Sequence, residues 1–257
     1  MLLRRVASHV SNQNWTAVAI DFVIVVFGVF IGIQVSNWND ERQREQTAKV
    51  YIERIRQDLR VNLADLRERL AYFNQVRTSA LGALEALDRP KQDLGEQFLI
   101  DTYQASQMLP RRFGRDTYDE ILSVGANDAI ADVPTRTRLA NFYRSIEAQL
   151  VLLQPEMLYR NSIRAHMPYP VQTAIRAACN DITDTGPAGE PIVTLPANCD
   201  PDLTPKEVSE AVAAILELDI RSNLTRRVTD LDLKLLALQQ TIDRTGMLDA
   251  YLENTGQ

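Results

Sequence analysis

The sequence predicts an all-α fold, with a single N-terminal transmembrane helix, a long stalk helix and an antiparallel helical bundle. Three observations lead to this class. Residues 15–38 form one apolar run, apolar side chains recur at steps of three and four along most of the later chain, and strand-like alternation is not found. After the tail and the anchor, about two hundred residues remain, which suits one helical domain.

Residues 15–38, WTAVAIDFVIVVFGVFIGIQVSNW, are expected to cross a bilayer as one helix. About twenty mostly apolar residues suffice to span a hydrocarbon core of roughly 30 Å. The two tryptophans of the sequence, Trp15 and Trp38, bracket the run and are predicted to anchor it at the two membrane interfaces. The alternative interpretation of the run is a buried core helix.

The anchor divides the chain into a tail, residues 1–14, and a helical domain, residues 39–257. The run is too long for the apolar part of a cleavable signal peptide, so an uncleaved signal anchor is expected. Basic residues near the membrane, counted literally, favour a cytoplasmic domain, but long domains translocate largely regardless of charge. Two cysteines in one loop-like stretch, Cys179 and Cys199, fit a disulfide in an oxidising compartment. We therefore expect a cytoplasmic N-terminus and a periplasmic C-terminal domain.

The stalk helix is predicted to end near Leu87, before Pro90, and could be continuous with the membrane helix. Its apolar face is formed by residues at steps of three and four: Ile52, Ile55, Leu59, Leu63, Leu66, Leu70 and Phe73. Further helices are expected over residues 94–109, within 111–125, over 132–153 and over 155–167.

Capping residues indicate where several of these helices begin and end. Asp116 is expected to cap the helix that Gly125 ends, and Asp132 with Pro134 to start the next. Thr204-Pro205-Lys206-Glu207 predicts a capping box that starts a helix after the loop at residues 180–203. The last long helix, which Gly246 is expected to end, carries a heptad seam of Leu224, Val228, Leu231, Leu235, Leu238 and Ile242.

Two stretches, 21–43 and 117–143, resemble a family of uncharacterised bacterial single-pass membrane proteins. In that family an acid opens an apolar run that ends in a QxNNWN-like signature, and an aromatic-acidic turn with a glycine follows later. The first pattern is matched here by Gln34, Asn37, Trp38 and Asn39, with Ser36 in place of the first Asn. The second is matched more loosely by Tyr118, Glu120, Gly125, Leu139 and Tyr143. The resemblance covers about a third of the chain and implies a bacterial cytoplasmic membrane, but no activity.

Asp21 lies inside the apolar run, and Gly28 and Gly32 follow on the same face of the helix within about 20°. Glycines four residues apart allow two membrane helices to approach closely, so these three residues form a predicted helix-packing seam. Three interpretations of Asp21 compete: an acid that reaches back to the cytoplasmic headgroups, a polar contact to a partner helix, and a proton site in a proton-coupled component.

The sequence offers no catalytic motif, no phosphate-binding glycine loop and no cluster of metal ligands, so no enzyme, cofactor or metal is expected. His166 stands alone in the domain and is expected to be structural or exposed. Arg111, Arg112 and Arg115 could bind an anion, although a solvated turn is the simpler interpretation. The net charge of −6 argues against nucleic acid as a partner.

These observations favour a membrane-anchored, non-enzymatic helical module that faces the periplasm and binds a partner protein, as a scaffold or accessory subunit. The expected partners are the lipid bilayer and a membrane or periplasmic protein or a second copy of the chain. Two alternatives remain open at this point. One is a periplasmic ligand-sensing domain that signals through a partner, and the other is a proton-coupled membrane component that uses Asp21.

Overall fold

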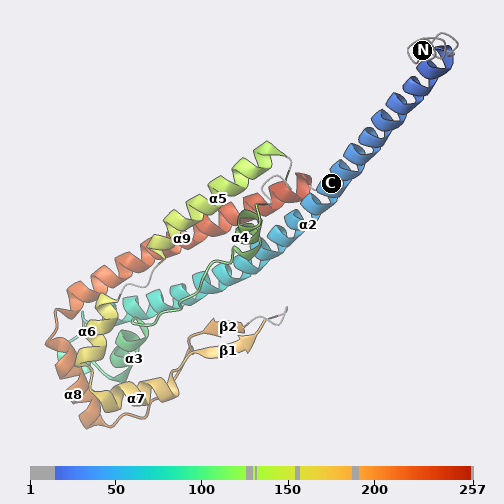
Figure 1. Ribbon diagram of the computed structural model, residues 1–257. Coiled ribbons are helices and arrows are strands. Elements are labelled where there is room, and N and C mark those ends of the chain that lie inside the picture. The colour runs from blue at the N-terminus through green and yellow to red at the C-terminus, as the bar shows by residue number, and fades with distance from the viewer. Residues whose placement is uncertain (1–14, 126–129, 131, 154–156, 187–190, 256–257) are drawn as a thin grey trace, which may run out of the picture.

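The computed structural model describes residues 15–125, 130, 132–153, 157–186 and 191–255, with the side chains of residues 15–18 and 152 excepted. Helices predominate throughout these residues, as the predicted all-α class requires, and one short hairpin is added to them. Figure 1 shows a single long helix whose first part projects from a body in which the remaining elements gather.

The long helix, α2 (Trp15–Ala86), has 72 residues and would measure about 108 Å at 1.5 Å per residue. The expected anchor and stalk are therefore one continuous helix. From residue 19 to residue 50 nearly every side chain is exposed, whereas from Tyr51 onward one face is covered. That face carries the predicted apolar positions, of which Ile55, Leu59 and Leu66 are completely buried.

Helix α9 (Ile220–Thr255) runs antiparallel to the second half of α2, side by side with it in Figure 1. Three ion pairs along the two helices establish the direction: Arg56–Asp249, Arg77–Asp232 and Asp88–Arg221. Helix α5 (Val133–Leu152) packs along α9. The heptad seam of α9 faces this core, since Leu224, Leu231, Leu238 and Ile242 are buried. We call residues 51–86 of α2, together with everything from α3 to α9, the helical body.

Shorter elements surround the far end of α2. They are the 3-10 turn η1 (Lys91–Asp93), α3 (Glu96–Gln104), α6 (Leu158–His166), α7 (Tyr169–Ala178) and α8 (Pro205–Leu216). Three arginines bind the turn after α3, where carbonyl groups are left without helical partners. Arg227 donates to the carbonyls of Ala105 and Gln107, Arg160 donates to the carbonyl of Ser106, and Arg164 donates to the Ser106 hydroxyl.

This turn explains why the helix predicted over residues 94–109 is shorter. Helix α3 ends at Gln104, because in the described structure the carbonyls of Ala105, Ser106 and Gln107 accept from arginine side chains and not from later backbone amides. The buried side-chain amide of Gln104 donates to the carbonyl of Cys179. The helix expected to reach residue 167 is α6, which ends at His166. Pro168 is the N-cap of α7, and Pro170 occupies its first turn, where no backbone donor is needed. Pro155, expected to start the helix before it, lies outside the described residues.

The prediction of no strands is wrong for residues 182–185 and 191–194. Strands β1 (Ile182–Thr185) and β2 (Pro191–Thr194) pair antiparallel, with Ile182 opposite Thr194. The hairpin lies against α2, where the Val193 amide donates to the Glu68 carboxylate and the Leu195 amide to the Gln75 side chain. Four-residue strands that are mostly exposed carry too little alternation to be found in sequence.

The helix ends test the capping predictions. The Asp132 carboxylate accepts from the Thr135 amide, and Thr204 with Glu207 forms both bonds of the capping box, so these two are confirmed. Gly125 follows α4 (Asp116–Ser123) with φ of +67°, the left-handed conformation of a helix end. Asp116 was wrongly expected to be the cap, because it is the first helical residue and Arg115 precedes it without a side-chain cap.

Gly246 was wrongly expected to end the last helix, since α9 continues through it to Thr255. Beyond Gly246, Leu248 and Leu252 are buried and Asp249 pairs with Arg56. Packing of this last stretch against α2 therefore outweighs the low helix propensity of one glycine.

Candidate functional site

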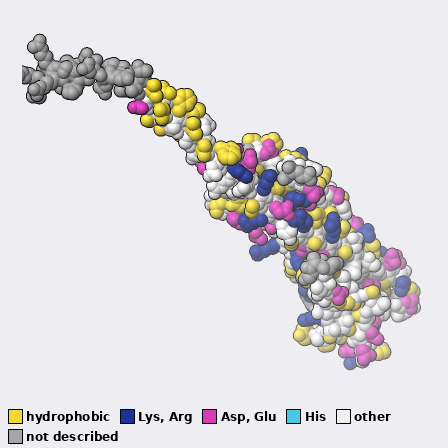
Figure 2. Space-filling view, turned by 90° about the vertical axis from the view of Figure 1, so that its right-hand side faces the viewer, with side chains coloured by type: hydrophobic (Ala, Val, Ile, Leu, Met, Phe, Trp, Pro, Cys, Tyr) yellow, Lys and Arg dark blue, Asp and Glu magenta, His cyan; other side chains and the backbone are white. Residues whose placement is uncertain are grey.

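The exposed first half of α2 is the most conspicuous surface of the molecule. Large apolar side chains from Ile20 to Val35 are about half exposed or more, and no described part of the chain packs over them. Figure 2 shows them as a hydrophobic segment that projects from a body of mixed charge. By length and composition this helix, alone among the described ones, could cross a membrane.

The predicted packing seam lies on this segment. Asp21, Gly28 and Gly32 are exposed, and a Cβ atom added at either glycine would meet nothing within 4 Å. At 100° per residue the three positions share one face, so the helix presents an acid and a shallow glycine surface together.

Trp38 marks the end of the apolar segment and is 65% exposed. The Arg42 guanidinium lies 5.8 Å from the centre of its ring, so an aromatic side chain and a cation stand together where the apolar run gives way to charged residues. Trp15 is the first residue of α2, and its side chain lies outside the described residues.

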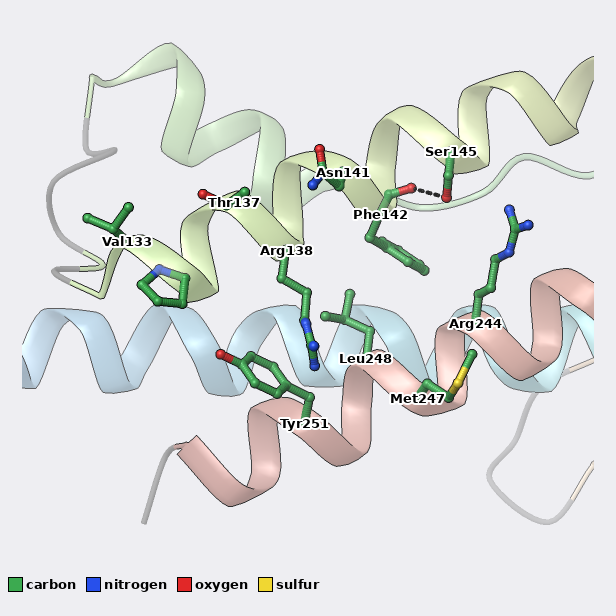
Figure 3. Close-up of a pocket in the computed structure, with 11 residues that line it drawn as sticks. Val133, Thr137, Arg138, Asn141, Phe142, Ser145, Arg244, Met247, Leu248 and Tyr251 are labelled. Atoms are coloured by element: carbon green, nitrogen blue, oxygen red, sulfur yellow. Dashed lines mark hydrogen bonds between the residues drawn. The ribbon is translucent and has the colours of Figure 1, made fainter.

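A groove of about 940 Å³ lies between α5 and α9 at the end of the body nearest the exposed part of α2. Figure 3 shows Arg138 of α5 reaching toward Tyr251 of α9, with its guanidinium 3.9 Å from the ring centre. Val133 and Met247 are 58% and 65% exposed along the groove. This groove could accept an apolar segment bordered by acidic side chains.

Cys179 and Cys199 form the expected disulfide, with their Cα atoms 5.3 Å apart. Cys179 ends α7 and is fully buried, and the bond ties α7 to the segment after the hairpin. Its place in the core indicates a structural role.

The three arginines singled out in the sequence are not brought together as one site. Arg115 pairs with Asp119 and Glu147, and Arg111 pairs with Glu68 and lies near Asp65. Arg112 is exposed and lines a pocket that also includes Arg69 and Lys234. His166 is exposed and contacts the carbonyl of Ser162. No group of three His, Cys, Asp or Glu side chains suited to a metal occurs among the described residues.

Sequence reasoning missed two buried cations, Arg69 and Lys234, which are 3% and 5% exposed. They line a pocket of about 350 Å³ with Arg111 and Arg112. A signal for both existed. Arg69 stands three residues after Leu66 and four before Phe73, and Lys234 stands three after Leu231 and four before Leu238. A cation at a core position of a helix indicates a buried charge that needs a partner.

Comparison with family models, with curated protein sequences and with solved structures finds no match to this chain. The similarity of residues 21–43 and 117–143 to a family of bacterial membrane proteins therefore stays a prediction.

Proposed function

We propose that the protein is a membrane-anchored, non-enzymatic helical module that faces the periplasm of a bacterial cell and binds a partner protein, as a scaffold or accessory subunit. The observation that carries this proposal is the continuity of α2. An exposed apolar segment suited to a bilayer runs without a break into a helix whose other half is the core of the body.

The seam supports a partner in the membrane. A carboxyl group is costly among lipid tails unless it packs against another helix or reaches the headgroups. Asp21 shares its face with Gly28 and Gly32, where the open space around both glycines would let a second helix come close. The partner is therefore a membrane protein with a small-residue helix, or a second copy of this chain.

The disulfide supports the orientation. A buried cystine is typical of proteins that fold in an oxidising compartment, and the periplasm is such a compartment. A periplasm-active reporter fused after Gln257 should therefore be active, and one fused before Met1 inactive. The reverse pattern would contradict both the orientation and the compartment.

Crosslinking in native membranes tests the seam. Single cysteines placed along residues 21–36 should crosslink to a partner or a second copy most strongly at 21, 25, 28 and 32. A flat profile would contradict the seam. Gly32→Leu should abolish crosslinking, because a large side chain pushes the two backbones apart.

Two substitutions control this experiment. Val23→Leu adds bulk on a face roughly opposite to the seam at 100° per residue, so it should leave crosslinking unchanged. Asp21→Asn keeps shape and hydrogen bonding, so association should persist. Loss of biological activity with association intact would favour the proton-coupled alternative.

A second candidate function is ligand sensing, in which the helical body binds a small molecule and signals through the partner. The pocket between Arg69 and Lys234 favours it, because buried cations and apolar walls together are typical of a binding site for small molecules.

A further inference from the structure

The pocket beside Arg69 is built from four parts of the helical body. Helix α2 supplies Arg69 and Phe73, and α9 supplies Lys234. The remaining wall comes from the end of α5 and from the segment before α4: Leu150, Leu153, Met108, Leu109, Pro110, Arg111, Arg112 and Phe113. These described lining residues include four cations and no carboxylate. The charged side chains that line the cavity are therefore all positive.

Arg69 is the central feature of this pocket. Its side chain is 3% exposed, and within the described structure its Nε and Nη1 atoms have no hydrogen-bond partner. The nearest carboxylate oxygen, Oδ2 of Asp65, lies 3.8 Å from Nη1, which is too far for a hydrogen bond. Burying a guanidinium with donors that lack acceptors costs free energy of folding. An oxyanion bound in the pocket would accept hydrogen bonds from Nε and Nη1 and so offset that cost.

Arg227 shows how the hydrogen bonds of a buried arginine are satisfied elsewhere in the body. Arg227 is 2% exposed, and it donates to the carbonyls of Ala105 and Gln107 at 2.9 and 3.0 Å. The fold therefore supplies acceptors where an arginine serves structure alone. Arg69 is buried to the same degree as Arg227, but its Nε and Nη1 atoms lack the acceptors that Arg227 has.

The acidic neighbours of Arg69 are shared or already occupied. The Asp65 carboxylate lies between two guanidinium groups. Its Oδ2 is 3.8 Å from Nη1 of Arg69, and its Oδ1 is 3.7 Å from Nε of Arg111. Glu68 accepts from Arg111 and from the Val193 amide. Burial lowers the pKa of Arg69 and raises that of Asp65, as expected when neither charge is well compensated.

The remaining walls are apolar. Phe73 and Phe113 are 3% and 8% exposed, and the Lys234 ammonium lies 4.9 Å from the centre of the Phe73 ring. An inorganic anion would leave these walls without a partner. A molecule with an oxyanion head and an apolar body would satisfy both the arginine and the aromatic side chains.

We propose that this pocket binds a small organic carboxylate, whose carboxyl group is held by Arg69 with Lys234 and Arg111 nearby and whose apolar body packs against Phe73 and Phe113. The proposal rests on the second candidate function, ligand binding by the body, and does not depend on a membrane partner. A planar carboxylate matches the two adjacent N–H groups of an arginine in a bidentate arrangement.

The position of the pocket excludes membrane lipid as the ligand. Arg69 lies 31 residues beyond Trp38 on the same unbroken helix, which is about 46 Å at 1.5 Å per residue. If Trp38 lies at the headgroups, a lipid that remains in the bilayer cannot reach Arg69. The ligand is therefore a soluble molecule of the compartment that the body faces.

Calorimetric titration of the full chain in lipid nanodiscs tests the proposal, with 3-phenylpropionate as the probe. The carboxylate should bind, and its neutral amide should bind roughly tenfold or more weakly, since hydrogen bonds to charged groups are the stronger ones. Equal binding of the two probes would overturn the role of the charge. Inorganic phosphate should also bind at least about tenfold more weakly, because it lacks the apolar body. Equal binding of phosphate would overturn the role of the apolar walls.

Arg69→Met keeps the length and removes the charge, and it should weaken carboxylate binding roughly tenfold to a hundredfold. Its unfolding temperature should stay the same or rise, because an apolar side chain replaces an unsatisfied buried cation. Arg77→Met is the matched control two turns along α2, where the arginine pairs with Asp232 at the surface, and it should leave binding unchanged.

A purely structural role of Arg69 gives a different result. In that case the wild-type protein would bind no probe at millimolar concentration, and Arg69→Met would lower the unfolding temperature. That outcome would overturn this proposal while leaving crosslinking at the membrane seam unaffected. Arg69→Lys, which keeps a charge but loses the planar fork, should bind the carboxylate with intermediate affinity.

Discussion

Arg56 of α2 and Asp249 of α9 form an ion pair, with Nε of the arginine 2.9 Å from Oδ1 of the aspartate, although 193 residues separate them in sequence. Their side chains are 15% and 20% exposed. Arg56 also lies 3.2 Å from Glu253. The pair fixes the last turns of α9 against α2 at the point where α2 leaves the body.

Arg56→Ala should lower the free energy of unfolding of the full chain by about 1 kcal/mol, since a partly buried pair is worth more than a fully exposed one. Chemical denaturation followed by circular dichroism measures it. Arg54→Ala is the control, because Arg54 pairs with Glu120 on the open surface and its removal should change little. If the two substitutions lowered the free energy of unfolding equally, the ion pair of Arg56 and Asp249 would not be what stabilises α9 against α2.

Two glycines should respond in opposite directions to alanine. Gly125 has φ of +67°, so Gly125→Ala should destabilise the protein by about 1 kcal/mol. Gly246 lies inside α9 with open space where a Cβ atom would stand, so Gly246→Ala should stabilise it by up to about 1 kcal/mol. Thermal unfolding of both variants tests this. Destabilisation by Gly246→Ala would mean that α9 ends near that residue after all.

The disulfide should contribute to stability by an amount that depends on the logarithm of the length of the loop that it closes. Cys179 and Cys199 are 20 residues apart, for which the chain-entropy estimate is about 3 kcal/mol. Replacing both by alanine should lower the free energy of unfolding by about that amount. In the native protein both should resist alkylation until reductant is added. Rapid labelling of unreduced protein would show that they are free thiols.

Asp101 should make the protein less stable as pH rises from about 4 to about 6. Burial raises the pKa of this α3 carboxyl to about 6, and the hydrogen bond from Gln97 offsets only part of the effect. Between its unfolded pKa of about 4 and this value, the folded state binds more protons than the unfolded state, so stability falls as pH increases. Above pH 6 the loss is complete.

Asp101→Asn should remove this decline and raise stability at pH 7.5 by about 1 to 2 kcal/mol. Urea denaturation at pH 4.5 and 7.5 measures the difference. Asp93→Asn, in the exposed η1 turn, is the control for removal of one carboxylate and should leave the stability at pH 7.5 almost unchanged. Equal slopes of the wild-type and Asp101→Asn profiles between pH 4 and 6 would contradict Asp101 as the source of the decline.

The sequence indicates long elements better than short ones. The apolar faces of α2 and α9 extend over many turns, so their periodicity identified Ile55, Leu59, Leu224 and Leu231 as core residues. The paired strands β1 and β2 have four residues each, and their position is set by contacts with Glu68 and Gln75 on α2, which is distant in sequence. Local sequence carries no trace of such contacts.

Of the two candidate functional surfaces, the sequence predicted the membrane seam but not the pocket, because only the seam lies within one helix. Asp21, Gly28 and Gly32 lie on one helix, so spacing alone placed them on one face. The pocket joins Arg69 and Lys234 from helices far apart in the chain. Each cation could have been recognised locally as a charge at a core position, but their approach to each other depends on the antiparallel register of α2 and α9.

The pairing of α2 with α9 also bears on how the protein is made. The ribosome completes the core half of α2 long before α9, which packs along its apolar face in the finished body. Until synthesis reaches the last helix, Ile55, Leu59 and Leu66 are without their main packing partner. Closure of the body must therefore wait until α9 has been synthesised. A chain that stops before α9 would expose this face to chaperones and proteases.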